Sequence, residues 1–480
     1  MKKTELFVLA IVTLVAVTTR LYGLGNPVAD WHSWRQVDTA TVARNFLKFG
    51  IDPLRPRFDD LSNIPSGKDN PKGYRMVEFP IYQVTAALGA RLFPGISIEI
   101  LLRTLTIVAS VGSGILIGLI VASVLDAYTG IIASLLYAVL PYSMYYGRTT
   151  LPDPHMVFWA LLSIYLLVKA QSAKGEKIWL LLATAAICGA IALLIKPPAL
   201  FLLLPAVYII FRRFSFSKNL FIGLFVYWFI CLCPLWWWRS WIMQYPEGIP
   251  VYTWLLNEGN IRFKGAWFYW LFAERLGKLI LGYWGLVPLG LGLLVKPEKN
   301  EGWFFRWWLI SAIAYMVIIA RGNVQHDYYQ ILIIPVVSVY LAKGFFFLLT
   351  NSVFSKLTAY PLSLITLLFM LAFSWYTIRT YYWINRQEIV DVGRYADALL
   401  PKNAKVIAPY NGDTTFLYQT DRQGWPIGFD IDKKITLGAT HYVTLSPTDK
   451  DLETRDLAQI YTVLVRNDKF AIIDLTKKRE

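Results

Sequence analysis

The chain has 480 residues, of which 56% are hydrophobic and 16% aromatic, and its mean hydropathy of +0.45 is too high for an ordinary soluble globule. Apolar runs of roughly 17–25 residues recur along most of the chain, which is typical of a polytopic α-helical membrane protein. The net charge of +15 does not indicate a nucleic-acid-binding protein, because Lys and Arg fall mostly in the loops between apolar runs and not in one soluble patch.

Taken in chain order, the apolar runs predict about eleven membrane-spanning helices. The first follows "MKKTE" and is long, without a clean small-residue cleavage site, which favours an uncleaved helix over a signal peptide. The run 81–92 is too short to cross a bilayer and is predicted to lie on the membrane surface as a helix. The predicted spans are residues 5–24, 100–123, 130–146, 154–170, 178–195, 197–212, 219–238, 277–295, 303–320, 328–348 and 356–377.

The charges of the short loops predict the orientation of these spans. The loops 169–177, 212–218 and 296–306 carry most of the short-loop Lys and Arg, so the positive-inside rule places them with the N-terminus in the cytoplasm. The alternation then leaves the long first loop, 25–99, and everything after residue 376 outside. We therefore expect a multi-pass protein of the cytoplasmic (inner) membrane whose unusual polar loops are extracytoplasmic.

The chain changes character from about residue 385. Its periodicity predicts helices at 387–400 and 450–461, and strands at 404–410, 440–446, 461–467 and 469–475. The expected fold is therefore a polytopic α-helical membrane module, residues 1–380, followed by a soluble extracytoplasmic α/β domain, residues 381–480. The large first outside loop belongs to the membrane module in this division.

The first outside loop contains the stretch "DWHSWRQVDTATVARNF", in which Asp30 and Asp38 are the carboxylates. One interpretation is a pair of surface ion pairs with Arg35 and Arg44, which is the ordinary role of carboxylates in a loop. The other is one wall of a polar cavity, because ionisable groups at membrane depth are costly and usually functional. Glu78, which opens "EFPIY", lies on the same predicted side.

The later outside loops carry further polar residues, each with an ordinary alternative. Asp153 in "LPDPHM" is equally well explained as a helix N-cap, and Lys196 before "PP" as a snorkelling side chain. His326 in "QHDYY" is by itself more often a structural hydrogen-bonding residue. Their shared side of the membrane favours one cavity. The polar residues predicted on this side are Arg148, Asp153, Lys196, Arg321, His326 and Asp327.

The order of these motifs resembles the GT-C glycosyltransferases. An acidic first loop is followed by "EFPIYQVTAALGARLFPG", then "GRTTLPDPHMVFW", and later "QHDYYQILIIPVV". The pattern is most similar to the bacterial branch that contains the protein O-mannosyltransferases and the lipid A aminoarabinose transferase. It covers roughly residues 5–350, and it implies a polyprenyl-phosphate-linked sugar as donor on the outer face of the cytoplasmic membrane.

Two positions depart from the family pattern. Members of this group carry an Asp-Glu pair in the first loop, shortly before an Ala-Arg. Aligning that element on Ala43-Arg44 places Arg35-Gln36 where the acidic pair belongs. Glu78 likewise stands where the family has a Lys before the interfacial helix.

The resemblance implies an inverting glycosyl transfer. Asp38, with Asp30 as second choice, is expected to act as general base on the acceptor hydroxyl, and Asp153 matches the Asp of the family's second motif. A phosphate leaving group needs cations and not an acid. The expected donor-phosphate contacts are Arg148, Lys196, Arg321, His326 and Tyr329, with Arg35 and Glu78 lining the remaining cavity.

Two other classes of function stay open. A polyprenyl-lipid flippase or transporter needs a similar cavity, but the sequence lacks the internal repeats typical of transporters. A non-catalytic lipid-binding homologue is compatible with the missing acidic pair.

No His, Cys or carboxylate spacing indicates a metal site, so no cofactor is expected, and a divalent cation bridging carboxylates and a lipid phosphate is left open. The expected partners are the lipid donor, a glycolipid, glycan or protein acceptor, and the membrane, without nucleic acid.

Overall fold

The computed structural model describes residues 2–298, 300–352 and 355–479. The chain divides into two compact units. The first, called here the bundle unit, comprises Met1–Leu24, Arg103–Ser240 and Tyr252–Tyr381. The second, called the sheet unit, comprises Gly25–Leu102, Trp241–Val251 and Tyr382–Glu480.

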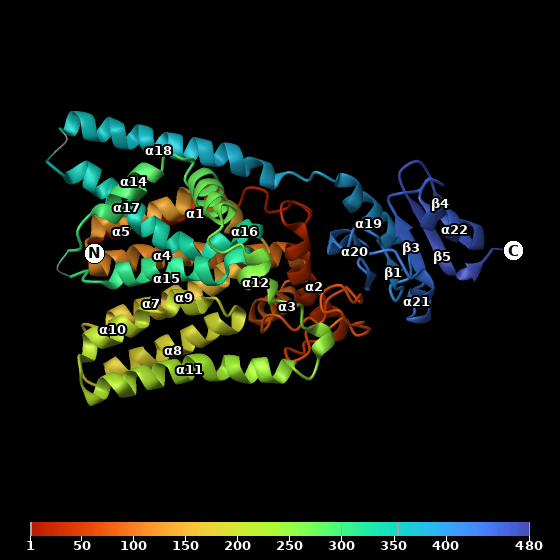
Figure 1. The fold of residues 1–480 in the computed structure, drawn as a ribbon, viewed down its shortest axis with the longest axis horizontal. Helices are drawn as coiled ribbons and strands as arrows, with labels where there is room; N and C mark the ends of the chain where they lie inside the picture. The colour runs from red at the N-terminus through yellow and green to blue at the C-terminus, as the bar shows by residue number, and fades with distance from the viewer. Residues whose placement is uncertain (1, 299, 353–354, 480) are drawn as a thin grey trace. The chain divides into compact units, whose positions relative to one another are not determined.

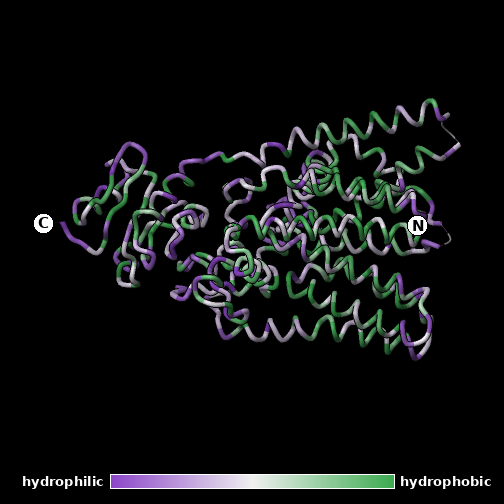
Figure 2. Tube along the Cα trace, turned by 180° about the vertical axis from the view of Figure 1, so that it is seen from behind, coloured by the Kyte–Doolittle hydropathy of each residue, from purple (hydrophilic) through white to green (hydrophobic). Residues whose placement is uncertain are grey.

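The bundle unit is built almost entirely of helices (Figure 1). Large apolar side chains of these helices are exposed as well as buried. Figure 2 shows hydrophobic residues along most of the helix lengths, as expected for helices surrounded by lipid. The main helices are α1 (Lys3–Arg20), α4 (Ile98–Val124), α5 (Ala127–Val139), α6 (Pro141–Tyr146), α7 (Asp153–Ala170), α8 (Lys177–Ile195), α9 (Ala199–Leu203), α10 (Pro205–Phe214), α11 (Lys218–Ile242), α14 (Leu286–Leu294), α15 (Phe304–Ile318), α16 (Ala320–Gln325), α17 (Ile334–Thr350) and α18 (Lys356–Ile378).

The multi-pass helical architecture expected from the sequence is confirmed. Among the described residues, five helical segments are long and apolar enough to cross a membrane, and each of the eleven predicted spans contains helix. The five are Ile98–Val124, Lys177–Ile195, Lys218–Ile242, Asp327–Thr350 and Lys356–Leu399, with shorter apolar helices at Ala127–Val139 and Phe304–Ile318. The number of eleven spans stays a prediction.

Several of the predicted spans are broken helices. Pro141 begins α6 directly after α5, and Pro205 begins α10 directly after α9, because proline lacks the N–H that would continue the preceding helix. The predicted span 277–295 divides between the end of a π-helix, η3 (Tyr269–Ile280), and α14. Between them Gly282 has a φ of +50° and lies against the backbone of α18, where a side chain would not fit.

The sheet unit contains two helices from the first long loop. α2 (Ser33–Phe49) carries the polar stretch singled out above, and most of its side chains are buried. α3 (Ile81–Leu92) coincides with the predicted surface helix. Short helices later in the unit are α19 (Gln387–Leu399), α20 (Thr414–Gln419), α21 (Ile431–Thr436) and α22 (Leu452–Ile460).

A small five-stranded sheet forms the centre of this unit, in the order β2-β1-β3-β5-β4. β1 pairs in parallel with both of its neighbours, whereas β3 and β4 pair antiparallel with β5. All four predicted strand regions contain a strand, while β2 was not foreseen because it is only two residues long. The strands are β1 (Val406–Ile407), β2 (Gly424–Trp425), β3 (His441–Thr444), β4 (Tyr461–Arg466) and β5 (Ala471–Lys478).

Both faces of the sheet are covered, and alternate residues of each strand go to opposite faces. On one face Val443 and Ile472 pack with Val392 of α19 and Phe416 of α20. On the other face, β3 and β5 contribute Tyr442 and Ile473, which pack with Leu457 of α22. Burial of these side chains is the main stabilising contribution within the unit.

The first loop also pairs with the sheet. Asp60 forms a parallel bridge with Gly424 of β2, and Leu61 donates its backbone N–H to the carbonyl of that glycine at 2.8 Å. Leu61 also contributes to the second core. Two regions more than 300 residues apart in sequence therefore form one folding unit.

Candidate functional site

Two helix ends of the bundle unit place a carboxylate and an amine together. Asp153 lies in the first turn of α7, between Pro152 and Pro154, where a negative charge suits the helix N-terminus. Lys196 is the residue after α8, and its extended backbone (φ −159°, ψ 120°) is the conformation that a following proline favours. Proline therefore stops α8 at the point where Lys196 projects.

Lys196 and Asp153 form a nearly buried ion pair. The Lys196 Nζ donates to Asp153 Oδ1 at 2.7 Å, and their side chains are 14% and 5% exposed. The ammonium also lies 5.2 Å and 4.9 Å from the ring centres of Tyr328 and Tyr329, within cation–π range. The second carboxylate oxygen of Asp153 is buried and has no hydrogen-bond partner among the described residues. Asp153 thus does not use its side chain to cap α7, which was one of the alternatives from the sequence.

The other predicted phosphate contacts of the bundle unit are distributed differently. His326, 9% exposed, stacks on Tyr328 with ring centres 5.4 Å apart. Arg148 is fully buried and donates to the carbonyl of Gly23 at 3.0 Å. The side chain of Arg321 is 37% exposed, with Glu258 4.0 Å away.

A carboxylate surrounded by tyrosines lies next to this group. Asp327 is 1% exposed, and its two oxygens accept hydrogen bonds from Tyr146 and Tyr381, each at 2.5 Å. Tyr142 donates to its backbone carbonyl at 2.6 Å, and Arg275 lies 3.8 Å from the carboxylate. The sequence placed Asp327 among the polar residues of its loop but did not identify these partners. The "YSMYY" run of α6 was the available signal.

The sheet unit holds the first-loop candidates. Asp38 of α2 is buried, and both of its oxygens are engaged within the unit. Oδ2 pairs with the guanidinium of Arg75 at 2.8 Å, and Oδ1 accepts from the Thr414 hydroxyl at 2.8 Å. Arg75 and Thr414 were not foreseen, because neither belongs to a motif and both are distant from Asp38 in sequence. Asp30 accepts a hydrogen bond from Gln36 Nε2 at 2.6 Å.

Both arginines of α2 form ion pairs with carboxylates that lie outside the stretch. Arg35 forms a buried ion pair with Glu78, so the two positions that depart from the family pattern meet. Arg44 pairs with Asp59 and, at 2.9 Å, with Asp421. These contacts tie α2 to the loop before α3 and to the residues after α20.

Two adjacent carboxylates that follow α2 in the chain, Asp59 and Asp60, are deeply buried. Burial raises the pKa of Asp59 above its usual value, although Arg44 lowers it. Burial raises the pKa of Asp60 to about 7, and the charge of Asp38 adds to this effect. Within the described residues, no group of three or more His, Cys, Asp or Glu side chains is arranged to hold a metal ion.

The comparisons with known proteins agree on one fold. Residues 77–238, about a third of the chain, match a family model described as dolichyl-phosphate-mannose-protein mannosyltransferase. No curated protein matches the chain in sequence. The crystal structure of ArnT from Cupriavidus metallidurans bound to undecaprenyl phosphate is similar over 97% of both chains, with a TM-score of 0.69 and 12% identity.

Further solved structures share this fold. The archaeal oligosaccharyltransferase AglB from Archaeoglobus fulgidus, in complex with an inhibitory peptide and a dolichol-phosphate, is similar over 98% of this chain and 74% of its own, with a TM-score of 0.56 and 12% identity. The apo form of ArnT from C. metallidurans has a TM-score of 0.66 at 13% identity, again over 97% of both chains. This chain therefore has the GT-C glycosyltransferase fold, as the resemblance implied.

Proposed function

We propose that this protein is an inverting glycosyltransferase of the cytoplasmic membrane, acting on its outer face. It moves a sugar from a polyprenyl-phosphate donor to a hydroxyl of a glycolipid, glycan or protein. The fold shared with ArnT, whose structure contains undecaprenyl phosphate, supports a lipid-phosphate donor. The C-terminal sheet and the first loop belong to the same outer side in this proposal.

The observation that carries the proposal is the Lys196–Asp153 pair. A lysine ammonium has three N–H donors, and Asp153 accepts one of them. The remaining donors are held in a largely buried place beside the rings of Tyr328 and Tyr329, where a charge-assisted bond to a phosphate oxygen is stronger than in water. Asp153 orients the ammonium of Lys196, and the lipid phosphate accepts hydrogen bonds from its remaining N–H groups.

In the reaction, the bond between the anomeric carbon and the phosphate oxygen breaks, and a new bond forms to the acceptor oxygen. The acceptor proton goes to a carboxylate, for which Asp38 is the first choice and Asp30 the second. Polyprenyl phosphate leaves as an anion stabilised by Lys196. Attack from the face opposite the leaving group inverts the anomeric configuration.

The alternative of a non-catalytic lipid-binding homologue is favoured by one observation, the engagement of both Asp38 oxygens by Arg75 and Thr414. Purified protein in vesicles with a polyprenyl-phosphate sugar distinguishes the two. Transfer that is lost in Asp38→Asn or Asp30→Asn but retained in Thr414→Val supports the enzyme. Donor binding without transfer in the native protein, whatever the acceptor, supports the non-catalytic homologue, and movement of the donor across the bilayer supports a flippase. Mass spectrometry of surface glycans with and without the gene identifies the acceptor.

A further inference from the structure

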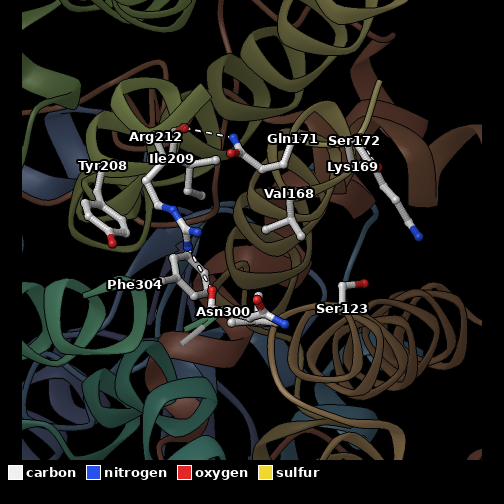
Figure 3. A pocket seen from close by; sticks show the side chains of 11 residues that line it. Ser123, Val168, Lys169, Gln171, Ser172, Tyr208, Ile209, Arg212, Asn300 and Phe304 are labelled. Atoms are coloured by element: carbon white, nitrogen blue, oxygen red, sulfur yellow. Dashed lines mark hydrogen bonds between the residues drawn. The ribbon is translucent and has the colours of Figure 1, made fainter. Parts of the chain in front are cut away.

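A polar pocket of about 430 Å³ lies at the end of the bundle unit where α4, α7 and α10 finish and α15 begins (Figure 3). Its volume is within the range of small-molecule sites. α7 has 18 residues, so the pocket lies about 27 Å along this helix from Asp153, close to the thickness of a bilayer core. It is therefore separate from the Lys196–Asp153 pair.

The lining of the pocket is divided between cations, other polar groups and apolar side chains. Lys169 and Arg212 supply positive charge, and no Asp or Glu is among the described residues that line the pocket. Neither cation has an ion-pair partner among the described residues. Arg212 donates to a backbone carbonyl and lies over the ring of Tyr208, and Lys169 lies over the ring of Tyr165. The neutral polar lining is Ser123, Gln171, Ser172, Tyr208 and Asn300, and the apolar lining is Val124, Val168, Ile209 and Phe304.

The walls of the pocket are fixed by hydrogen bonds between elements. Gln171 Nε2 donates to the carbonyl of Ile209 at 2.8 Å, which joins the end of α7 to α10 (Figure 3). Arg213 donates to the carbonyl of Ala173 at 2.9 Å, next to the same junction. Arg212 donates to the carbonyl of Asn300 at 2.8 Å and so fixes the segment before α15, which forms another side of the pocket. The pocket is thus built by the fold, and Arg212 keeps further N–H donors for a ligand.

We infer that this pocket binds the phosphate headgroup of an anionic phospholipid. The excess of uncompensated positive charge selects an anion, and the apolar residues beside it suit the glycerol and upper acyl region better than they suit a free ion. Basic pockets between membrane helices on the cytoplasmic side are typical places for such headgroups. The loops around the pocket are those that the positive-inside rule places in the cytoplasm, so the lipid belongs to the inner leaflet.

The ordinary explanation for Lys169 and Arg212 is membrane orientation alone, which requires positive charge but no pocket. A matched pair of variants separates the two explanations. Lys169→Gln/Arg212→Gln removes two charges from the lining, whereas Lys174→Gln/Lys218→Gln removes two charges from the neighbouring loops without touching it. Ser123→Leu fills the pocket from α4 without changing any charge and without affecting the Arg212 contact.

The experiment uses the full-length protein in detergent, titrated with phosphatidylglycerol, phosphatidylcholine or inorganic phosphate, with bound lipid counted by native mass spectrometry. We expect phosphatidylglycerol to bind the native protein and the loop variant equally, and the lining variant and Ser123→Leu at least about tenfold more weakly, the equivalent of one charge-assisted hydrogen bond. Equal binding of phosphatidylglycerol and phosphatidylcholine, or an equal loss in the loop variant, would overturn the site. Displacement of the lipid by millimolar inorganic phosphate would overturn the lipid assignment in favour of a soluble anion.

Discussion

Arg35 of α2 and Glu78 before α3 form a buried ion pair, with both side chains 7% exposed. These are the two positions at which the chain departs from the pattern of the proteins it resembles, with a cation in place of an acid and an acid in place of a cation. The exchange of signs leaves an oppositely charged pair within the sheet unit. Arg35 also donates to Thr39 at 3.1 Å, which fixes its guanidinium on α2.

We expect either single change, Arg35→Met or Glu78→Gln, to lower the thermal stability of the protein strongly, because each leaves one buried charge without its partner. Such losses amount to roughly 3–5 kcal/mol. The charge-exchanged double variant Arg35→Glu/Glu78→Arg should recover much of the loss, and melting curves measure all four proteins. Equal stability of the single and the exchanged variants would show that the pair contributes no coupling.

A second prediction concerns the proposed phosphate contact. Lys196→Met should lower the turnover of a polyprenyl-phosphate sugar by roughly 10²–10³-fold, the usual effect of removing one group that stabilises transition-state charge. Lys196→Arg should retain more activity, because the charge remains. Arg321→Gln, at an exposed position facing Glu258, should change the turnover by much less. Steady-state kinetics in vesicles measures the three.

The control for this experiment is Asp153→Asn, which keeps the shape of the side chain but removes the charge that orients Lys196. We expect its loss in turnover to be non-additive with that of Lys196→Met, since the two residues act as one unit. Additive losses would mean that Asp153 acts independently of Lys196.

The sequence could predict the helical elements and the tail strands, because apolar runs and alternation depend on local periodicity. It placed Asp153, Lys196 and Tyr329 on one side of the membrane, and the structure brings these three together. It could not predict the partners of Asp38, since Arg75 and Thr414 reach it through tertiary packing. The sequence also did not predict the pairing of the first loop with β2, because a strand of two residues has no periodic pattern.

The tyrosines around Asp327 lead to a third prediction. Tyr146→Phe and Tyr381→Phe each remove one hydrogen bond to a buried carboxylate, which typically costs about 1.5–3 kcal/mol for a charged acceptor. Asp327→Asn keeps the size of the side chain but replaces an oxygen that accepts a tyrosine hydroxyl. We expect all three to lower the melting temperature, and Asp327→Asn also to raise the KM for the lipid donor, because Tyr328 and Tyr329 follow it directly in the chain.

Tyr146→Phe and Tyr381→Phe keep the two aromatic rings, whose centres lie 6.4 Å apart, and remove only the hydroxyl groups. A melting temperature unchanged in both variants would show that these hydrogen bonds to Asp327 do not stabilise the folded protein.

The last prediction concerns the pH dependence of stability in the sheet unit. Burial raises the pKa of Asp60 from 3.8 to about 7 in the folded protein, so between these values the folded state binds more protons than the unfolded state. Stability linked to this group is therefore fully present below pH 4 and decreases as the pH rises toward 7.

Asp60→Asn removes the titration while its side-chain oxygen can still accept the bond that the Ser62 N–H makes at 2.8 Å. We expect this variant to melt at a higher temperature than the native protein at pH 8, and the difference to shrink at pH 5. Ser62→Ala, which leaves that backbone N–H in place but removes a hydroxyl that lowers the pKa of Asp60, should extend the loss of stability to higher pH. A native protein whose melting temperature changes with pH in parallel with that of Asp60→Asn would show that Asp60 is already ionised in the folded state across this range.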